Sequence, residues 1–286
     1  MDVPIIPGDK EYPSRLLRLK TPPKQLYSAG QPLARILQRP AVAIIGSRSV
    51  TPYGRKVTHE FARALAEQGV VVISGLALGV DTIAHKAALD VGGLTIAVLP
   101  RSLHNIYPSH NRLLAQTITG RGGTLVSEYA DGAVAYRSSF VARNRIVAGL
   151  ADAILITEAA IDSGSLHTAR FAQAIHVPVL IVPGPIDSPS SIGTNRLLHK
   201  EAVAALHPDD VLRVLCIRKH RTKIRNVRGR NPQEQAILEL LQSDTHRSDE
   251  LLTRSTLSTA SFNRTMTMLE IDGKIQMYGV GQWGLI

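Results

Sequence analysis

The sequence of 286 residues contains a single cysteine, Cys216, and few aromatic residues, which make up 4% of the chain. One cysteine excludes a disulfide framework and a metal site built on several thiolates, and it favours a reducing compartment. Apolar residues amount to 44%. The chain can therefore bury a sizeable core, and the shortage of aromatic rings makes that core mainly aliphatic.

Long apolar runs and an N-terminal targeting pattern are also missing. The apolar runs are short and interrupted, whereas a membrane-spanning helix needs about 20 apolar residues. The first residues, MDVPIIPGDKEYPSR, lack the cationic and then apolar regions of a signal peptide. We therefore expect a cytoplasmic protein without a membrane span.

Several catalytic motifs are absent as well. The sequence has no G-x-x-x-x-G-K-[ST], no G-x-S-x-G and no H-E-x-x-H, which argues against a P-loop nucleotide site, a serine hydrolase and a zinc peptidase. Its ten histidines are scattered without the spacing of metal ligands. We expect neither a metal ion nor a cofactor.

Positive charge is abundant, and it is unevenly distributed. The net charge is +10. Residues 1–216 carry a net charge of +6, residues 217–230 hold seven basic and no acidic residues, and residues 231–286 have a net charge of −3. This pattern favours an anionic partner for the main body and the basic segment, but not for the C-terminal segment.

Strand-like and helix-like segments alternate through the first 216 residues. Runs rich in Val, Ile and Leu predict strands, and helices are expected from Thr51 to about Gln68 and in the gaps between later strands. The expected strands are 41–46, 71–75, 94–100, 124–128, 153–158 and 178–184, and the other helices are 81–91, 108–119, 140–150 and 164–175. Apolar strands between helices predict a doubly wound α/β domain with a mostly parallel Rossmann-like sheet.

The pattern changes after the basic segment. Apolar spacing predicts helices near 237–241, from Ser248 and from Thr259 to Glu270, and two short strands joined by a Gly-rich turn follow. Three helices and a hairpin are typical of a winged helix. We therefore expect an N-terminal extension packing on the core (1–40), a Rossmann-like domain (41–216), a basic linker (217–230) and a winged-helix domain (231–286).

The strand 41–46 ends in the loop Gly46-Ser47-Arg48-Ser49, where a dinucleotide-binding fold would have a Gly-rich turn. The second and third glycines are missing, and Arg48 is present instead. Backbone N–H groups that enter a helix favour an anion, and an arginine fork matches phosphate oxygens. The loop can hold a single phosphate, or it can be an ordinary strand–helix turn with a capping serine.

Two further segments offer polar side chains after strands. Phe140, Arg143, Asn144 and Arg145 are expected at or near the start of a helix, where they can contact phosphate and base or form a solvated face. Ser163-Gly164-Ser165 opens another helix, whose N-terminus can hold a second phosphate.

Titratable residues near these loops permit an enzymatic interpretation. Asp81 and His85 are four residues apart and share a helix face, either as an acid–base pair or as a capping Asp with a local hydrogen bond to His, which we favour. Glu158 is the best candidate for a general base, and the structural alternative for this segment is a helix cap together with a solvated carboxylate.

A series of segments in this order resembles the DprA/Smf family. They include "AIIGSRSVTPYG", "VISGLALGVDTIAHKAAL", "FVARNRIVAGLAD", "ITEAAIDSGSLHTARFA" and "VPGPIDSPSSIGTNRLL", and the resemblance covers residues 10–200. The C-terminal segment looks like the winged-helix extension of that family. His167 and the pair Arg101-Ser102 depart from the usual family pattern.

The resemblance implies a Rossmann-like domain that binds single-stranded DNA, protects it during natural transformation and loads a RecA-type recombinase, without enzymatic activity and as a homodimer. It implies DNA contacts at Gly46, Ser47, Arg48 and Arg143–Arg145, and at Ser163–Ser165. Two alternatives remain open. One is an enzyme like the nucleoside-monophosphate phosphoribohydrolases, and the other is a nucleotide-sensing regulator whose winged helix reads DNA.

Overall fold

The computed structural model describes residues 3–134, 136–200, 202–217, 228–243, 245–279 and 281–285. The chain forms two compact units, Met1–His220 and Arg221–Ile286. From residue 218 to 227, the predicted basic linker lies outside the described residues. No helix of the described part is long and apolar enough to cross a membrane.

The first unit is built on an eight-stranded sheet in the order β1-β5-β4-β3-β2-β6-β7-β8, in which neighbouring strands are parallel except for the antiparallel pair of β1 and β5. The strands are β1 (Tyr27–Gly30), β2 (Ala41–Gly46), β3 (Val71–Ser74), β4 (Thr95–Leu99), β5 (Thr124–Ser127), β6 (Ala153–Glu158), β7 (Val179–Ile181) and β8 (Val203–Ala204). The predicted doubly wound, mostly parallel Rossmann-like fold is confirmed. The antiparallel β1 and the short β8 were not expected.

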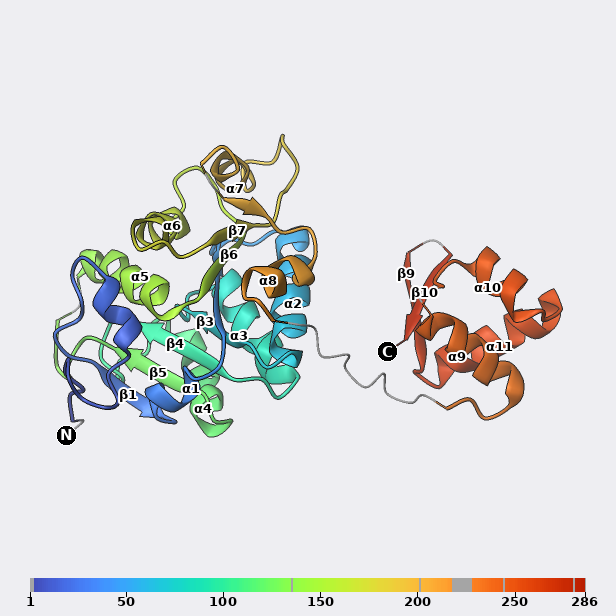
Figure 1. Ribbon diagram of the computed structural model, residues 1–286, viewed down its shortest axis with the longest axis horizontal. Helices are drawn as coiled ribbons and strands as arrows, with labels where there is room; N and C mark the ends of the chain where they lie inside the picture. Colours follow the sequence, from blue (N-terminus) through green and yellow to red (C-terminus); the bar gives the residue numbers. More distant parts are fainter. Residues whose placement is uncertain are drawn as a thin grey trace. The chain divides into compact units, whose positions relative to one another are not determined.

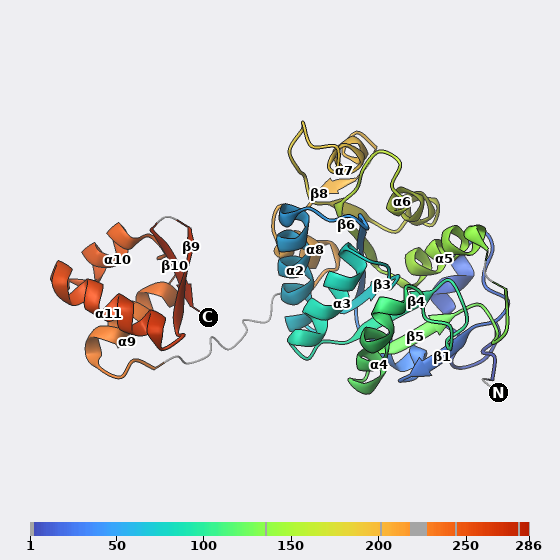
Figure 2. The ribbon, with the colours of Figure 1, turned by 180° about the vertical axis from the view of Figure 1, so that it is seen from behind.

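Helices cover both faces of this sheet (Figures 1 and 2). One face carries α2 (Pro52–Glu67), α3 (Val80–Asp90), α4 (Arg112–Gly120) and α8 (Pro208–Val214). The other carries the 3-10 helix η1 (Ser14–Arg18), α1 (Leu33–Ile36), α5 (Arg137–Leu150), α6 (Ser165–Ala174) and α7 (Ile192–Leu197). A second 3-10 helix, η2 (Ser109–Asn111), precedes α4.

The strand β2 shows why both faces are buried. Val42 and Ile44 pack on the α2 side, and Ala43 and Ile45 pack on the α5 side. Because successive side chains of a strand alternate between faces, a sheet covered twice needs an unbroken apolar run. The helix after β2 begins as predicted, with the Thr51 hydroxyl accepting from the Gly54 N–H at 3.0 Å.

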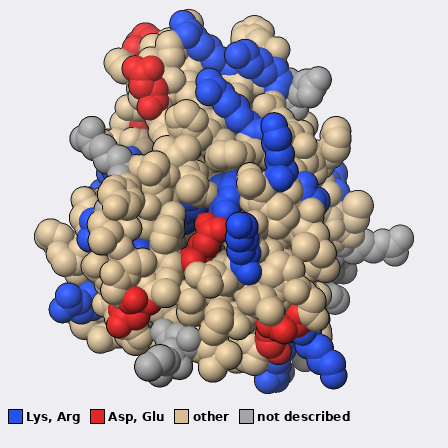
Figure 3. All heavy atoms as spheres, turned by 90° about the vertical axis from the view of Figure 1, so that its left-hand side faces the viewer, with Lys and Arg blue, Asp and Glu red and all other residues tan. Residues whose placement is uncertain are grey.

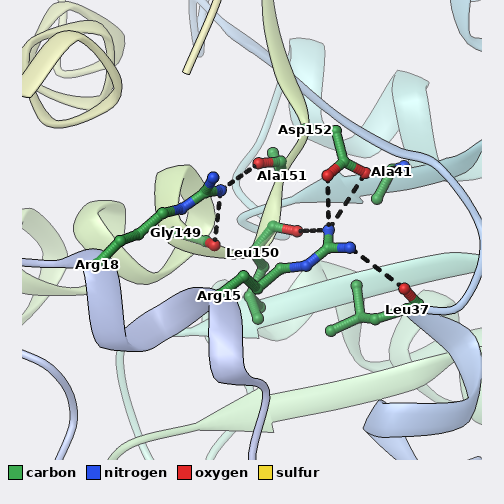
Figure 4. A network of polar contacts seen from close by, with 8 residues as sticks. All are labelled: Arg15, Arg18, Leu37, Ala41, Gly149, Leu150, Ala151 and Asp152. Carbon is green, nitrogen blue, oxygen red and sulfur yellow. Dashed lines mark hydrogen bonds and ion pairs between the residues drawn. The ribbon is translucent and has the colours of Figure 1, made fainter. Parts of the chain in front are cut away.

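The N-terminal segment is attached to α5 by two arginines of η1 (Figure 4). Arg15 donates to the carbonyls of Leu150 (2.7 Å) and Leu37 (3.2 Å) and pairs with Asp152 at 3.2 Å. Arg18 donates to two further carbonyls at the end of α5, those of residues 149 and 151, at 3.1 and 2.7 Å. The last carbonyls of a helix have no partner within it, so these guanidinium groups satisfy the C-terminus of α5.

The second unit is a winged helix, as predicted. It contains α9 (Pro232–Gln242), α10 (Ser248–Ser255), α11 (Thr259–Ile271) and the antiparallel strands β9 (Ile275–Gly279) and β10 (Gln282–Leu285). Its core is separate from that of the first unit and is formed by the apolar faces of these elements, with Ile237, Leu241, Phe262 and Trp283 among the buried side chains.

Candidate nucleic-acid interface

A cleft of about 510 Å³ opens beyond the carboxyl ends of the central strands. It lies beside β2, which is flanked by β3 and β6. The strand order reverses at this point, because β3, β4 and β5 follow on one side of β2 and β6, β7 and β8 follow on the other. Ligands of open parallel sheets bind at such a switch point. All expected site residues except Arg145 line the cleft, namely Gly46, Ser47, Arg48, Ser49, Phe140, Arg143, Asn144, Ser163, Gly164 and Ser165.

The loop after β2 is held by its own hydrogen bonds. The Ser47 N–H donates to the Glu158 carbonyl at 2.8 Å. The Ser47 hydroxyl donates to the Ser49 carbonyl (2.8 Å) and accepts from the Ser49 N–H (3.1 Å). The backbone at Gly79 packs closely against this loop, and a Cβ at this position would collide with the carbonyls of Ser47 and Arg48. The backbone is thus set before any ligand arrives.

Arg48 is the free cation of this loop. Its side chain is exposed, and its guanidinium lies 5.9 Å from the centre of the Phe140 ring. No carboxylate pairs with it among the described residues. A guanidinium on a fixed loop, held only by a loose ring contact, is free to bind a phosphate.

Arg143 lies differently from the expectation. It is 6% exposed, and it donates to the carbonyls of Gly75, at 2.5 Å, and Val98. Burial lowers the pKa of Arg143 to about 10, and the charge of Asp81 opposes that shift. A Cβ at position 75 would collide with the guanidinium in this place, so the close approach depends on Gly75. Arg143 therefore forms the floor of the cleft and organises its loops.

Asp81 secures the same loop from the opposite side. Its carboxylate accepts from the N–H groups of Gly75 (3.1 Å) and Ala77 (3.3 Å). Burial raises the pKa of Asp81 above its ordinary value, while the Arg143 charge and the two N–H groups act against that rise. Leu76, which lies between Gly75 and Ala77 in the chain, has a φ of +58° although it is not a glycine. Only contacts with the surrounding structure can maintain such a backbone conformation.

Asn111 provides one of those contacts, and it was missed by sequence reasoning. Its side-chain amide donates to the Leu76 carbonyl and to the Thr82 hydroxyl, at 2.8 Å each. The asparagine lies more than 30 residues away in the chain, and no local pattern distinguishes it from a surface residue. It is buried and supports the loop without lining the cleft.

The expected Asp81–His85 hydrogen bond is absent, and Asp81 does not cap the helix that follows it. Gly79 is the N-cap of α3, and the Asp81 carboxylate turns back to the preceding loop. His85 is fully buried, and its Nδ1 lies 2.6 Å from the Thr95 hydroxyl. Thr95 uses its only proton on the Val72 carbonyl, so His85 must be the donor.

The third wall of the cleft is the turn before α6. The hydroxyls of Ser163 and Ser165 are 2.7 Å apart, and the Asn144 side-chain amide donates to the Gly164 carbonyl at 3.3 Å. This last bond connects α5 to the N-terminus of α6 across the cleft. The N-terminus of a helix favours an anion.

Arg145 points away from the cleft. Its guanidinium pairs with the Glu128 carboxylate at 2.6 Å, and its side chain is 13% exposed. We expected Arg143–Arg145 at or near the start of a helix, but α5 begins at Arg137, so these residues lie in its interior. Consecutive helix residues project about 100° apart, so three of them cannot face one ligand.

Glu158 does not line the cleft either. Its side chain is 2% exposed, and its carboxylate accepts from the Thr51 N–H at 3.0 Å. Glu158 therefore lies at the N-terminus of α2 and outside the cleft, and because it is buried the alternative of a solvated carboxylate is wrong. Among the described residues, no group of three His, Cys, Asp or Glu side chains could hold a metal ion.

Comparison with known proteins agrees with this fold. The model of the family described as DNA recombination-mediator protein A matches residues 4–216, and that of the DprA winged helix domain matches residues 223–278. The chain belongs to the DNA recombination-mediator protein A family. The resemblance read from the sequence is thereby confirmed.

Named relatives in several bacteria are similar over most of the first unit. Protein Smf of Escherichia coli is 40% identical over 209 residues, which are 73% of this chain and 55% of that protein. The DNA processing protein DprA of Streptococcus pneumoniae is 37% identical over 71% of each chain. The chain spans about half the length of the first curated relatives it matches.

Two solved structures share the fold. DprA from Streptococcus pneumoniae superposes with a TM-score of 0.70 at 35% identity, covering 77% of this chain and 75% of that one. DNA processing protein A from Helicobacter pylori, solved to describe its single-stranded DNA binding mode, has a TM-score of 0.66 at 36% identity and covers 76% and 98%.

Proposed function

We propose that this chain binds single-stranded DNA without base-sequence specificity through the cleft beyond β2, β3 and β6. The observation that carries the proposal is the prearranged loop Gly46–Ser49, whose exposed Arg48 lines the cleft and pairs with no carboxylate in the part of the chain that the structure describes. A relative with this fold is described by its single-stranded DNA binding mode, which supports the choice of ligand.

The surface around the cleft suits a polyanion. The face on the left of Figure 1, towards which β4 and β5 point, is hollowed near its middle and carries a row of basic side chains in its upper part (Figure 3). The elements at that height include α6 and α7, which bear the exposed Arg170 and Arg196. Phosphates bound by arginines release counterions, which makes binding depend on salt.

The biological role we propose is delivery. The protein would protect single-stranded DNA and load a RecA-type recombinase onto it during recombination or natural transformation, acting as a homodimer in the cytoplasm. The family's description as a recombination mediator supports this role. Delivery requires binding without chemical change to the DNA, and we propose that the chain is not an enzyme.

The winged helix is better suited to a protein partner than to duplex DNA. Three of its basic side chains lie in ion pairs within the unit, Arg230 with Asp272 (2.8 Å), Arg247 with Asp249 (2.8 Å) and Lys274 with Glu234 (3.1 Å). Reading duplex DNA needs cations free for phosphates. We therefore propose that this unit binds protein.

A salt-dependent titration tests the proposed DNA binding. A labelled single strand and a blunt duplex of equal length are titrated at two salt concentrations. The single strand is expected to bind more tightly, with an affinity that falls steeply with salt. Equal affinity for both forms would exclude the proposal.

The enzyme alternative has its own test. Nucleoside monophosphates incubated with the protein are expected to release no free base, because Glu158 is engaged at α2 and does not face the cleft. Base release that the substitution Glu158→Ala abolishes would establish the enzyme instead.

A further inference from the structure

A second, smaller hollow of about 60 Å³ adjoins the cleft. The two share Arg48, Gly75, Ala77, Phe140 and Arg143 as lining residues, so they lie side by side. The additional wall comes from the segment after β4, with Pro100, Tyr107 and Pro108, and from the exposed Leu78. None of these four residues belongs to the site described above.

Two aromatic rings contact each other at this wall, and a guanidinium group lies against each of them. The rings of Tyr107 and Phe140 meet edge to face, with centroids 5.5 Å apart and planes at 82°. The Arg101 guanidinium lies over the Tyr107 ring, 4.7 Å from its centre, and Arg48 lies 5.9 Å from the Phe140 ring. The contacts therefore link these groups in the order Arg48, Phe140, Tyr107, Arg101.

Packing of the core does not account for this row. Tyr107 is 45% exposed although it is a large ring in a protein with few aromatic residues. The Arg101 Nε is buried, and it has no hydrogen-bond partner within the described ranges. The Tyr107 ring is thus a contact of this guanidinium, and the ring is exposed whereas Arg101 is half-buried.

Unpaired nucleobases are the ligands that such a row fits. Single-stranded nucleic acids are bound by cations that follow the backbone and by aromatic rings or arginine planes on which successive bases stack. A phosphate alone would need the cations but not the rings. The Arg48–Phe140 contact is loose, so a base can take its place on the ring while Arg48 binds a phosphate.

We propose that Tyr107 and Arg101 form a stacking surface for the bases that follow the nucleotide held in the cleft. This inference rests on the proposed single-stranded DNA binding and assigns the outer part of the same strand. Tyr107 provides the ring, and Arg101 holds that ring and adds its own plane. Because every base has a π face, the surface adds affinity without selecting a base sequence.

Abasic oligonucleotides test the stacking surface directly. A single strand and an abasic strand of the same length and charge are titrated against the full chain, its Tyr107→Leu variant and its Tyr107→Phe variant. Tyr107→Leu is expected to weaken binding of the strand with bases by about fivefold or more, since stacking contributes about 1–3 kcal/mol per base. Binding of the abasic strand and the salt dependence should stay unchanged.

The conservative variants separate stacking from folding. Tyr107→Phe keeps the ring and should bind like the unsubstituted chain, whereas Arg101→Lys keeps the charge but loses the plane and should reduce the preference for bases. An equal loss of affinity for both strands in Tyr107→Leu, or no loss for either, would overturn the stacking surface. If the unsubstituted chain binds neither strand, the proposed function itself fails.

Discussion

Arg143 and Arg48 are both arginines of the cleft, but they perform different work. Arg143 is buried on two carbonyls beside Asp81, whereas Arg48 is exposed on a fixed loop. Removing a buried cation leaves its acceptors unsatisfied and a nearby carboxylate uncompensated. Removing an exposed cation leaves the fold intact and takes away only its ligand contact.

The substitution Arg143→Met is therefore expected to lower the free energy of unfolding by about 3 kcal/mol or more. Arg48→Met should change stability by less than about 0.5 kcal/mol and weaken single-stranded DNA binding by about 1–3 kcal/mol, independently of base sequence. Urea unfolding and DNA titration of both variants measure these effects. A stable Arg143→Met variant with weakened binding would show that Arg143 contacts DNA itself.

His85 makes stability depend on pH. Burial lowers the pKa of His85 to about 3, and the Arg143 charge acts in the same direction. The unfolded chain binds a proton near its ordinary pKa of about 6.5, so it holds more protons than the folded chain between these values. Above about pH 6.5, His85 is neutral in both states and does not reduce the free energy of unfolding. As the pH falls from 6.5 towards 3, the unfolded chain gains a proton that the folded chain does not bind, so the free energy of unfolding decreases.

We expect the free energy of unfolding to fall with decreasing pH more steeply in the unsubstituted chain than in a His85→Leu variant. The difference between the two slopes should approach about 1.4 kcal/mol per pH unit between pH 6 and 4. Urea unfolding at a series of pH values measures it, and Asp81, which is common to both proteins, cancels. Parallel slopes would mean that His85 is protonated in the folded state.

At the scale of elements, the cleft depends on how α5 is anchored. The helix carries Phe140, Arg143 and Asn144 towards the cleft and ends on the two arginines of η1 (Figure 4). Leu16 and Leu19 pack against Gly149, where a Cβ would press into both side chains. The N-terminal segment is thus part of the support of the sheet and of α5.

Arg15→Met should accordingly lower the free energy of unfolding by about 1–3 kcal/mol, because charge-assisted hydrogen bonds to the Leu150 and Leu37 carbonyls are lost. Arg63→Met is the matched control, since Arg63 forms an exposed pair with Glu67 one turn away on α2. Such pairs contribute about 0.3–0.5 kcal/mol. Similar losses in both variants would contradict the proposal that the arginines of η1 anchor α5.

At the scale of the whole molecule, the two units should differ in their contribution to DNA binding. The first unit contains the cleft, and the winged helix has a net charge of −3 over residues 231–286. Nearby acidic residues repel phosphates within a Debye length of about 8 Å. The basic segment 217–230 has seven cations that can add phosphate contacts.

A chain ending at Gly229 is therefore expected to bind single-stranded DNA within about threefold of the full chain, a difference below about 1 kcal/mol. A chain ending at Cys216 should lose more affinity and show a weaker salt dependence. Titrations of the three proteins at several salt concentrations compare them. A tenfold loss on ending at Gly229 would show that the winged helix contacts DNA.

Much of the fold could be predicted because its signals are local. The strand 41–46 and the cap at Thr51 were placed correctly from an apolar run and a Thr-Pro pair. The strand β1 was missed because it has only four residues and pairs with β5 nearly 100 residues later. No periodicity in so short a segment distinguishes a strand from a loop.

The candidate site was predicted by position rather than by role. The loop Gly46–Ser49 follows a strand in a parallel sheet, so its place at the ligand-binding edge could be inferred from order alone. The roles of Arg143 and Arg145 could not, because their directions depend on where α5 begins. Tyr107 had no local signal, since its partners Phe140 and Arg101 meet it only in the folded chain.

The sequence by itself determined six of the eight strands of the described sheet, the winged helix and the loops that carry the candidate site, because apolar periodicity and caps act over a few residues. The tertiary structure alone decided which polar groups face the cleft. It placed Glu158 at the start of α2, turned Arg145 to Glu128 and left Arg48 exposed. Burial and long-range partners set these directions, and neither is contained in a residue's neighbours along the chain.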